Sequence, residues 1–284
     1  MRNVLITGPP RSGTTLVCSL LNKLPDTIAL HEPMNVFEFV GRSGDEIANM
    51  IDKFCAESRK SLLKDGSAIS KHVGGEVRDN AASDQIGRAG TRARKTEHGR
   101  VTFEKRLSEN FTLAIKHPAA FAALLEPLSK RFECFAVVRN PLATLSSWNS
   151  LDWLPLKDGH SPIGEKLDVD LARVLAKEAD PIERQICILE WFYDHFHRFL
   201  PESAVIQYEE LIASRARELA KYFPSAAELE EDLSSRNVSK FYDRALMTDI
   251  GQRLMKRDGP VWHFYTKRDV ESLLNEVGSG APGS

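Results

Sequence analysis

The sequence predicts an α/β protein of three layers, in which a central, mostly parallel sheet of five strands is flanked by helices. Short β-branched runs alternate with segments of helical periodicity, which is the pattern of α/β units. The run 132–138 is nearly all apolar, as expected for a central parallel strand that is buried on both faces. A glycine-rich turn joins the first apolar run to the first helical segment.

Each predicted strand is a short apolar run that ends at a polar residue or a turn signal. Pro33 follows the second run closely, and proline stops strand pairing. In chain order, the expected strands are Asn3–Thr7, Thr27–Leu30, Phe111–Ile115, Phe132–Val138 and Ala204–Gln207.

Each predicted helix shows apolar spacing, a start signal or both. Leucines recur at helical spacing over 16–24. Pro118 and Pro141 are suited to the first helical position, and the run 180–183 supplies a cap, a first-turn proline and an acidic third position. The expected helices are 16–24, 118–128, one from Pro141, 182–200 and 209–222.

The composition bounds the function classes. The chain has 284 residues, with 42% hydrophobic content and a net charge of −2, so we expect a single domain at 1–277 and a flexible tail or added linker at 278–284. With no overall basic field, neither nucleic acid nor an anionic membrane is an expected partner. The cysteines show no disulfide or metal-binding spacing, and no apolar run approaches the roughly 20 residues that span a bilayer, so a cytoplasmic protein is expected. The oligomeric state stays open.

Two stretches break the alternation of strands and helices. A polar insertion covers about 41–105, and an irregular, substrate-binding loop is expected at about 151–166. Insertions at the carboxyl ends of parallel strands commonly set specificity, so we expect both stretches to border the acceptor site. The segment 88–106 is locally basic, and it is either a solvated loop or a lid over an anionic ligand.

The turn after the first strand, GPPRSGTT, has the glycine spacing of a phosphate-binding loop. Thr14 takes the place of the usual lysine and Thr15 that of the hydroxyl residue, while Arg11 supplies a positive charge. The loop amides and the helix start still favour an anion. Phosphoryl transfer needs the lysine and magnesium because the transferred group carries two charges, whereas a sulfuryl group carries one. The loop therefore favours sulfuryl transfer without a metal; a degenerate loop that binds another anion is the alternative.

A second motif follows the fourth strand. Arg139 ends that strand, and Ser147 comes eight residues later, after Pro141. Eight residues are a little more than two helical turns, so Arg139 and Ser147 can face the same side and hold one phosphate.

Together, the two motifs resemble the nucleotide-binding elements of the sulfotransferase family, whose donor is 3′-phosphoadenosine 5′-phosphosulfate and whose product is 3′,5′-adenosine bisphosphate. The first is similar to the 5′-phosphosulfate loop and the second to the 3′-phosphate element; the segment 205–211 is similar to a third element near the adenosine. This resemblance, which runs from residue 3 to about 212, implies a P-loop-like fold and sulfuryl transfer to a hydroxyl or, less often, an amine. The donor-binding residues that it implies are Pro10, Arg11, Ser12, Gly13, Thr14, Thr15, Arg139, Ser147 and Tyr208.

Two family features lack a clear counterpart. The aromatic residue that often follows the loop is Leu16 here, which leaves Tyr208 and Trp148 as candidates for stacking on adenine. The family's C-terminal basic-glycine loop matches 256–259 only loosely, so a surface turn is as well supported there as a phosphate clamp.

Sulfuryl transfer needs a general base and a cation beside the transferred group. Glu32 lies in His31-Glu32-Pro33, which resembles the Glu-Pro segment of bacterial and carbohydrate-directed members, where the glutamate is the base. His117 follows Lys116, which resembles the Lys and His segment of cytosolic small-molecule members. We expect Glu32 to be the base, with His117 as the alternative and Lys116 assisting Arg11; a turn-capping carboxylate and a surface ion pair are the structural alternatives.

The resemblance implies a small-molecule or carbohydrate acceptor, with the Glu-Pro segment leaning towards carbohydrate. Two other classes remain open. A P-loop kinase that uses Mg-ATP conflicts with the missing lysine, and a non-catalytic interaction module conflicts with the intact loop and base.

Overall fold

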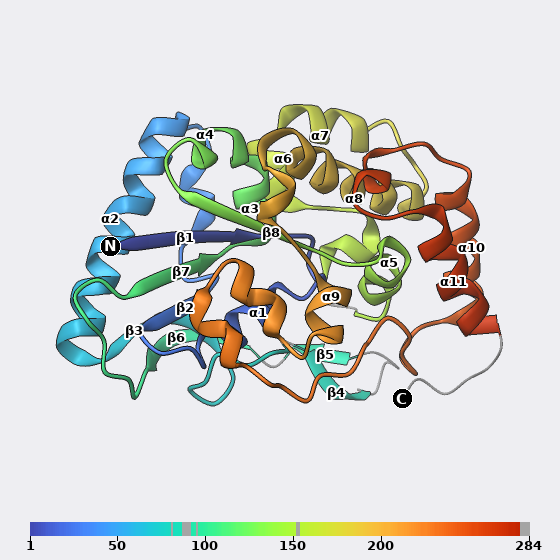
Figure 1. Cartoon of the computed structure of the whole chain (residues 1–284). Helices are drawn as coiled ribbons and strands as arrows, with labels where there is room; N and C mark the ends of the chain where they lie inside the picture. Colours follow the sequence, from blue (N-terminus) through green and yellow to red (C-terminus); the bar gives the residue numbers. More distant parts are fainter. Residues whose placement is uncertain (81, 87–91, 95, 152–153, 279–284) are drawn as a thin grey trace.

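The structure is a computed structural model that describes residues 1–80, 82–86, 92–94, 96–151 and 154–278. Its central sheet has the strand order β2-β7-β1-β8-β9, and every neighbouring pair in that sheet is parallel. The carboxyl ends of the strands therefore meet at one edge (Figure 1). The predicted α/β fold with five parallel strands is confirmed. The strands are β1 Arg2–Thr7, β2 Thr27–His31, β7 Thr112–Lys116, β8 Glu133–Val138 and β9 Val205–Gln207.

Helices cover both faces of this sheet (Figure 1). In the view of Figure 1, α3, α4, α6, α7 and α8 lie above the sheet and α1 and α9 below it, while the strands point towards α5, α10 and α11. The bounds are α1 Thr14–Leu21, α2 Gly44–Asp65, α3 Pro118–Ala123, α4 Leu125–Ser129, α5 Pro141–Asn149, α6 Pro162–Leu167, α7 Val169–Leu175, α8 Pro181–Phe199, α9 Tyr208–Ala213, α10 Arg244–Met255 and α11 Lys267–Gly278. Short 3-10 helices are η1 Val36–Phe39, η2 Pro155–Asp158, η3 Glu202–Ala204, η4 Arg217–Lys221, η5 Pro224–Glu228 and η6 Pro260–His263.

Helix α8 forms as its sequence signals indicate. The side chain of Asp180 accepts hydrogen bonds from the backbone N–H groups of Ile182 and Glu183, and Pro181 takes the first helical position. The helix buries Ile186, Leu189, Tyr193 and Phe196 against the core. Among the described helices, none has both the length and the apolar composition needed to cross a membrane.

Two predicted helices are shorter than expected. The helix predicted over 118–128 breaks at Leu124, whose ψ is 12°, because Pro127 has no N–H to continue the helical ladder. The helix predicted over 209–222 ends at Ala213, since Arg215 and Ala216 have positive φ angles of 55° and 75°. Ala216 then donates its N–H to the carbonyl of Leu211, which closes the helix end.

The polar stretch 41–105 contains a long helix that the sequence analysis missed. Helix α2 begins with a capping box, in which Ser43 N donates to Glu46 Oε2 at 2.8 Å and Ser43 Oγ accepts from Glu46 N at 3.3 Å. It buries Ile47, Ile51 and Leu62. Strands β3 Ser67–His72 and β6 Glu97–Thr102 then pair antiparallel, and β4 Ala82–Ile86 pairs with β5 Arg92–Arg94.

Two cations of the basic segment 88–106 hold this region together and do not line the central pocket. Arg100 Nη1 donates to the hydroxyls of Ser61 and Ser67 at 3.1 and 2.9 Å. Lys105 Nζ donates to the carbonyl oxygens of Leu24 and Thr27. For these two residues, the hypothesis of a lid over an anionic ligand is wrong. Arg88 and Lys95 lie outside the described residues.

Arg59 on α2 fixes this helix to the amino ends of the central strands. Its Nη1 donates to the carbonyl of Phe111 at 2.7 Å, its Nη2 to the carbonyl of Arg2 at 2.6 Å, and its Nε to Asn3 Oδ1 at 3.0 Å. Only 6% of Arg59 is exposed. Removing the guanidinium therefore leaves buried carbonyl oxygens without a donor.

We expect the substitution Arg59→Met to lower the free energy of unfolding by about 3 kcal/mol, because charged hydrogen bonds are lost and their acceptors stay buried. Urea denaturation measures this change. Lys60→Met is the matched control, since Lys60 is exposed on the same helix, and we expect it to change stability by less than about 0.5 kcal/mol. Equal losses in the two variants would contradict the anchoring role of Arg59.

Candidate active site

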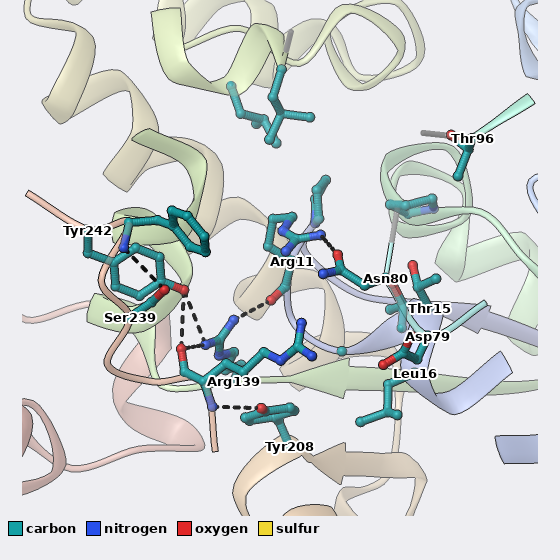
Figure 2. Close-up of a pocket in the computed structure, with 18 of the residues that line it drawn as sticks. Arg11, Thr15, Leu16, Asp79, Asn80, Thr96, Arg139, Tyr208, Ser239 and Tyr242 are labelled. Carbon is teal, nitrogen blue, oxygen red and sulfur yellow. Dashed lines mark hydrogen bonds between the residues drawn. The ribbon is translucent and has the colours of Figure 1, made fainter. Parts of the chain in front are cut away.

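A cavity of about 1180 Å³ lies at the carboxyl edge of the sheet. Every central strand contributes to it: Glu32 follows β2, Lys116 ends β7, the loop at 8–13 follows β1, Arg139 follows β8, and Tyr208 follows β9. The cavity is therefore where parallel α/β sheets usually bind ligands. Figure 2 shows Arg11, Arg139 and Tyr208 around its centre.

The loop between β1 and α1 depends on its two glycines. Gly8 has a φ of 149°, and a Cβ there would stand 2.3 Å from the carbonyl oxygen of Val137. Gly13 has a φ of 104° and precedes α1, and its Cβ would stand 2.9 Å from the ring of Tyr208. Neither position accepts a side chain without a shift. The loop can thus present the start of α1, at Thr14 and Thr15, directly to the cavity.

Two buried side chains, Ser12 and Trp148, lie within and against the loop. Ser12 is fully buried, and its Oγ has no hydrogen-bond partner among the described residues. Trp148 is also fully buried, and its Nε1 donates to the carbonyl of Pro10 at 2.6 Å. The expectation that Trp148 is a candidate for stacking on adenine is wrong, because its ring has no exposed face.

Arg139 is buried beneath a segment that covers the cavity. Its Nη1 donates to the carbonyl of Arg11 at 2.9 Å, its Nη2 to the carbonyl of Arg236, and its Nε to Asn237 Oδ1 at 2.9 Å. The guanidinium carbon also lies 4.8 Å from the ring centre of Tyr208. Only 4% of Arg139 is exposed. It lines the cavity while its donors are engaged with the protein (Figure 2).

Ser147 and Arg11 are in contact with each other. Arg11 Nε donates to Ser147 Oγ at 3.2 Å, and Arg11 Nη1 donates to Asn80 Oδ1 at 3.1 Å. Ser147 is fully buried and is not among the residues that line the cavity, whereas Arg139 is. The structure therefore places Ser147 behind Arg11 and does not place Ser147 and Arg139 on one shared opening.

The sequence analysis missed the segment 234–244, which lies across the cavity. Its backbone contacts Arg139, and Arg236 N donates to the hydroxyl of Tyr208 at 3.0 Å. Arg236, Lys240 and Arg244 all line the cavity. Three basic residues at intervals of four, among serines and an asparagine, are the signal that could have identified it. Basic residues that line the cavity are Arg11, Lys71, Lys116, Arg139, Arg236, Lys240 and Arg244; the acidic ones are Glu32, Asp79 and Asp232.

The loosely matched loop at 256–259 is not part of the cavity. Arg257 Nη2 donates to Glu183 Oε2, at 2.5 Å, and its Nη1 donates to Glu190 Oε2 at 2.9 Å. None of the residues 256–259 lines the cavity. The phosphate-clamp alternative for this loop is wrong, because its arginine is held in ion pairs on α8.

Glu32 lies at the other end of the cavity, in an ion-pair cluster. Its Oε1 accepts from Lys116 Nζ at 2.7 Å, and its Oε2 accepts from Lys71 Nζ. Its Oε1 is also 3.3 Å from His31 Nε2. The side chain of Glu32 is 22% exposed and that of Lys116 is 4% exposed. Lys71, on β3, was not predicted as a site residue.

The charge state of this cluster follows from its contacts. Burial opposes ionisation of Glu32, but Lys116, His31 and Lys71 together hold the pKa of its carboxyl well below the usual range. Burial and the nearby Lys116 lower the pKa of His31 to about 4. Glu32 is thus an anion between two lysines at neutral pH. Its lowered pKa adds stability above about pH 4.3, and this stability is lost as the pH falls through the folded-state pKa.

His117 faces away from the cavity. Its Nε2 accepts a hydrogen bond from the backbone N–H of Met34 at 3.2 Å, and its ring packs edge-on against Phe121. Burial lowers the pKa of His117 to about 3. The ring is therefore a neutral acceptor that supports the turn after Glu32, and it does not line the cavity.

The described residues contain no group of three or more His, Cys, Asp or Glu side chains placed to hold a metal ion. No protein-family model matches the chain, and no curated protein gives a significant sequence match.

Two solved structures show limited similarity to the chain. One is the sulfotransferase domain of the olefin synthase from Synechococcus PCC 7002, at 16% identity and a TM-score of 0.36, covering 99% of this chain and 95% of that one. The other is the sulfotransferase STF1 from Mycobacterium tuberculosis H37Rv, at 12% identity and a TM-score of 0.34, covering 97% of this chain and 76% of that one. At these values, neither similarity assigns a function or a residue role.

We expect the substitution Lys71→Met to raise the pKa of the Glu32 carboxyl, because one of the cations that favour its ionised form is removed. A carboxyl ¹³C NMR titration measures this pKa, with the signal assigned by its loss in Glu32→Gln. Lys130→Met is the control, since Lys130 forms an ion pair with the exposed Glu126, at 3.0 Å. An unchanged pKa in Lys71→Met would show that the contact does not persist in solution.

Proposed function

We propose that this protein is a sulfotransferase that transfers the sulfuryl group of 3′-phosphoadenosine 5′-phosphosulfate to the hydroxyl of a small acceptor. One observation carries the proposal: a single cavity joins a glycine loop at a helix start, a surplus of basic residues and an ionised carboxylate between two lysines. The cavity exceeds the roughly 300–1,000 Å³ of ordinary ligand pockets, so it has room for a nucleotide and a second molecule.

The donor fits the residues at the centre of the cavity. The loop approaches the cavity with backbone alone at Gly13, and the first turn of α1 carries no acidic side chain that would compete for its amides. Arg11 would bind the phosphosulfate end, exchanging its hydrogen bond to Asn80 for one to the anion. Thr14 and Thr15 would support that end from the helix start.

A second anionic group is expected near Arg139. We assign the 3′-phosphate to the cations of the segment 234–244, with Arg139 beneath them and Tyr208 beside Gly13. Ser147 would then act through Arg11, because Ser147 Oγ accepts a hydrogen bond from Arg11 Nε. This assignment differs from the expectation that Arg139 and Ser147 share one phosphate.

The bound donor supplies an activated sulfuryl group next to a phosphate leaving group. The acceptor hydroxyl gives its proton to Glu32 and forms a new bond from its oxygen to sulfur, while the bond between sulfur and the phosphate oxygen breaks. Lys116 and Arg11 balance the negative charge on the transferred group and on the leaving phosphate. Lys116 also contacts Glu32 at 2.7 Å, so a sulfonate that draws Lys116 away raises the proton affinity of Glu32.

His117 is a weaker choice of base than Glu32. Its Nε2 is engaged with the backbone N–H of Met34, and its ring does not line the cavity, whereas Glu32 does. We propose that His117 positions the turn at Glu32.

We expect 3′,5′-adenosine bisphosphate to stabilise the protein against thermal unfolding, and 5′-AMP and Mg-ATP to stabilise it much less. A ligand at 100 times its dissociation constant adds about 2.7 kcal/mol. Differential scanning fluorimetry measures this shift. Stabilisation by Mg-ATP alone would identify a kinase-like enzyme, and stabilisation by none of the three would favour a non-catalytic module.

The same assay tests the segment 234–244. Arg236→Met keeps the backbone contacts of residue 236 and removes an exposed cation, and we expect it to weaken bisphosphate binding roughly tenfold, about 1.4 kcal/mol. Lys256→Met is the matched control, because Lys256 is exposed and outside the cavity. An equal effect of both variants would contradict the assignment of the 3′-phosphate to the segment 234–244.

We expect Glu32→Gln to reduce kcat by about 10² to 10⁴-fold, because the amide cannot accept the acceptor's proton, while the affinity for the bisphosphate stays within about threefold. Steady-state kinetics and calorimetry measure the two quantities. Glu126→Gln, an exposed carboxylate in an ion pair with Lys130, is the control. If Glu32→Gln retained its kcat, Glu32 would not be the general base.

A further inference from the structure

One wall of the cavity is mainly apolar. It comprises Pro118 and Ala119 at the start of α3, together with Leu154, Pro155, Pro162 and Ile163 from η2, α6 and the residue before η2. We call these six residues the apolar wall. Pro155 and Pro162 are exposed, and Leu154, Ile163 and Pro118 are half-buried, so carbon surface faces the open cavity.

The local sequence explains why this wall offers few backbone donors. The wall includes the starts of three helices, α3, α6 and η2. Each of these helices has a proline at its first position: Pro118, Pro162 and Pro155. Proline has no backbone N–H, so these helix starts offer one donor fewer than usual and present ring carbons instead.

Two polar residues of the same stretch, His160 and Ser161, also line the cavity, and each has a contact within the protein. His160 Nδ1 accepts from Arg184 Nη2 at 2.9 Å, and the backbone N–H of Ser161 donates to Glu165 Oε1 at 2.7 Å. Ser161 is 4% exposed. A sugar placed against this wall would leave several hydroxyl groups unpaired, and each unpaired buried polar group costs free energy.

The wall adjoins the reacting carboxylate. Pro118 follows Lys116 by two residues, Lys116 Nζ contacts Glu32 Oε1, and α6 packs against α3. The cations Arg236, Lys240 and Arg244 belong to the segment over Arg139, which follows β8. Glu32 follows β2, and the strands β7 and β1 lie between β2 and β8 in the sheet. The cations of the segment 234–244 thus lie over Arg139, and the ion-pair cluster of Glu32 lies next to the apolar wall.

From this arrangement, and building on the proposed sulfuryl transfer, we infer that the acceptor is an alcohol or phenol with a hydrocarbon body, and that the apolar wall binds that body. The hydroxyl of the acceptor then reaches Glu32 while its alkyl or aryl part lies on the wall. This assigns an acceptor class other than the carbohydrate towards which the Glu-Pro segment leans. Pockets for small ligands are usually lined by apolar side chains, with a few polar groups that fix the orientation of the ligand.

The test uses a series of linear alcohols, from 1-butanol to 1-octanol, with glucose and N-acetylglucosamine as the sugar probes. Burial of one methylene is worth about 0.8 kcal/mol, so KM should fall up to about fourfold for each added carbon. The sugars should show a KM at least tenfold above that of 1-octanol. A KM that does not depend on chain length, or a lower KM for a sugar, would overturn the inference.

Variants test whether the apolar wall determines the KM for the alcohols. We expect Ile163→Asn to raise the KM for 1-octanol at least tenfold without changing the affinity for the bisphosphate. Val169→Asn is the matched control, because Val169 is 67% exposed and outside the cavity. An unchanged KM in Ile163→Asn would contradict the assigned surface.

A direct binding measurement keeps this test separate from that of the proposed function. Ligand-observed NMR with 2-naphthol reports binding to the wall whether or not a nucleotide binds, and Ile163→Asn should weaken it. If 2-naphthol binds at the wall and the bisphosphate does not bind, the sulfotransferase proposal fails and the apolar ligand class stands. If the bisphosphate binds and 2-naphthol does not, the acceptor class fails alone.

Discussion

The site depends on the close approach of two backbones at Gly8. The central strand β1 turns there beside the carbonyl of Val137 on β8, at a distance that leaves no room for a Cβ. Because the turn is this tight, the loop can place Arg11 above Arg139, whose guanidinium bonds the Arg11 carbonyl, and Pro10 above the indole N–H of Trp148. The positions of the loop, the arginine and the start of α1 are therefore linked through one backbone contact.

The second constraint is electrostatic. In a cavity with more cations than anions, the basic side chains would repel one another if nothing lay between their charges. Here, Arg139 is solvated by protein carbonyls, and Lys71 and Lys116 share the carboxylate of Glu32. These contacts replace water around the buried charges and leave a positive potential in the cavity. An anionic ligand then competes with neutral carbonyls and with one carboxylate.

The sequence was enough to predict the central strands and the loop, because buried parallel strands are continuous apolar runs and the loop has a fixed glycine spacing. It was less informative where tertiary contacts decide. Helix α2 carries a capping-box signal at Ser43 and Glu46, but its polar composition hid the helix. The segment 234–244 has basic residues at intervals of four but no apolar periodicity, and its position depends on its contacts with Arg139. Likewise, Lys71 reaches Glu32 from β3, and no local pattern relates those two residues.

The prolines at the starts of α3, α6 and η2 have a consequence for how this protein can diverge. Their side chains shape one wall of the cavity, yet none of them donates a backbone hydrogen bond that the core requires. Two of them, Pro155 and Pro162, lie on a stretch that contributes no strand to the central sheet. Selection can therefore alter the stretch 154–163 in steps, exchanging one ligand preference for another, while the glycine loop and the Glu32 cluster stay intact. The residues proposed for the reaction and the residues proposed to select the acceptor therefore lie on different segments of the chain.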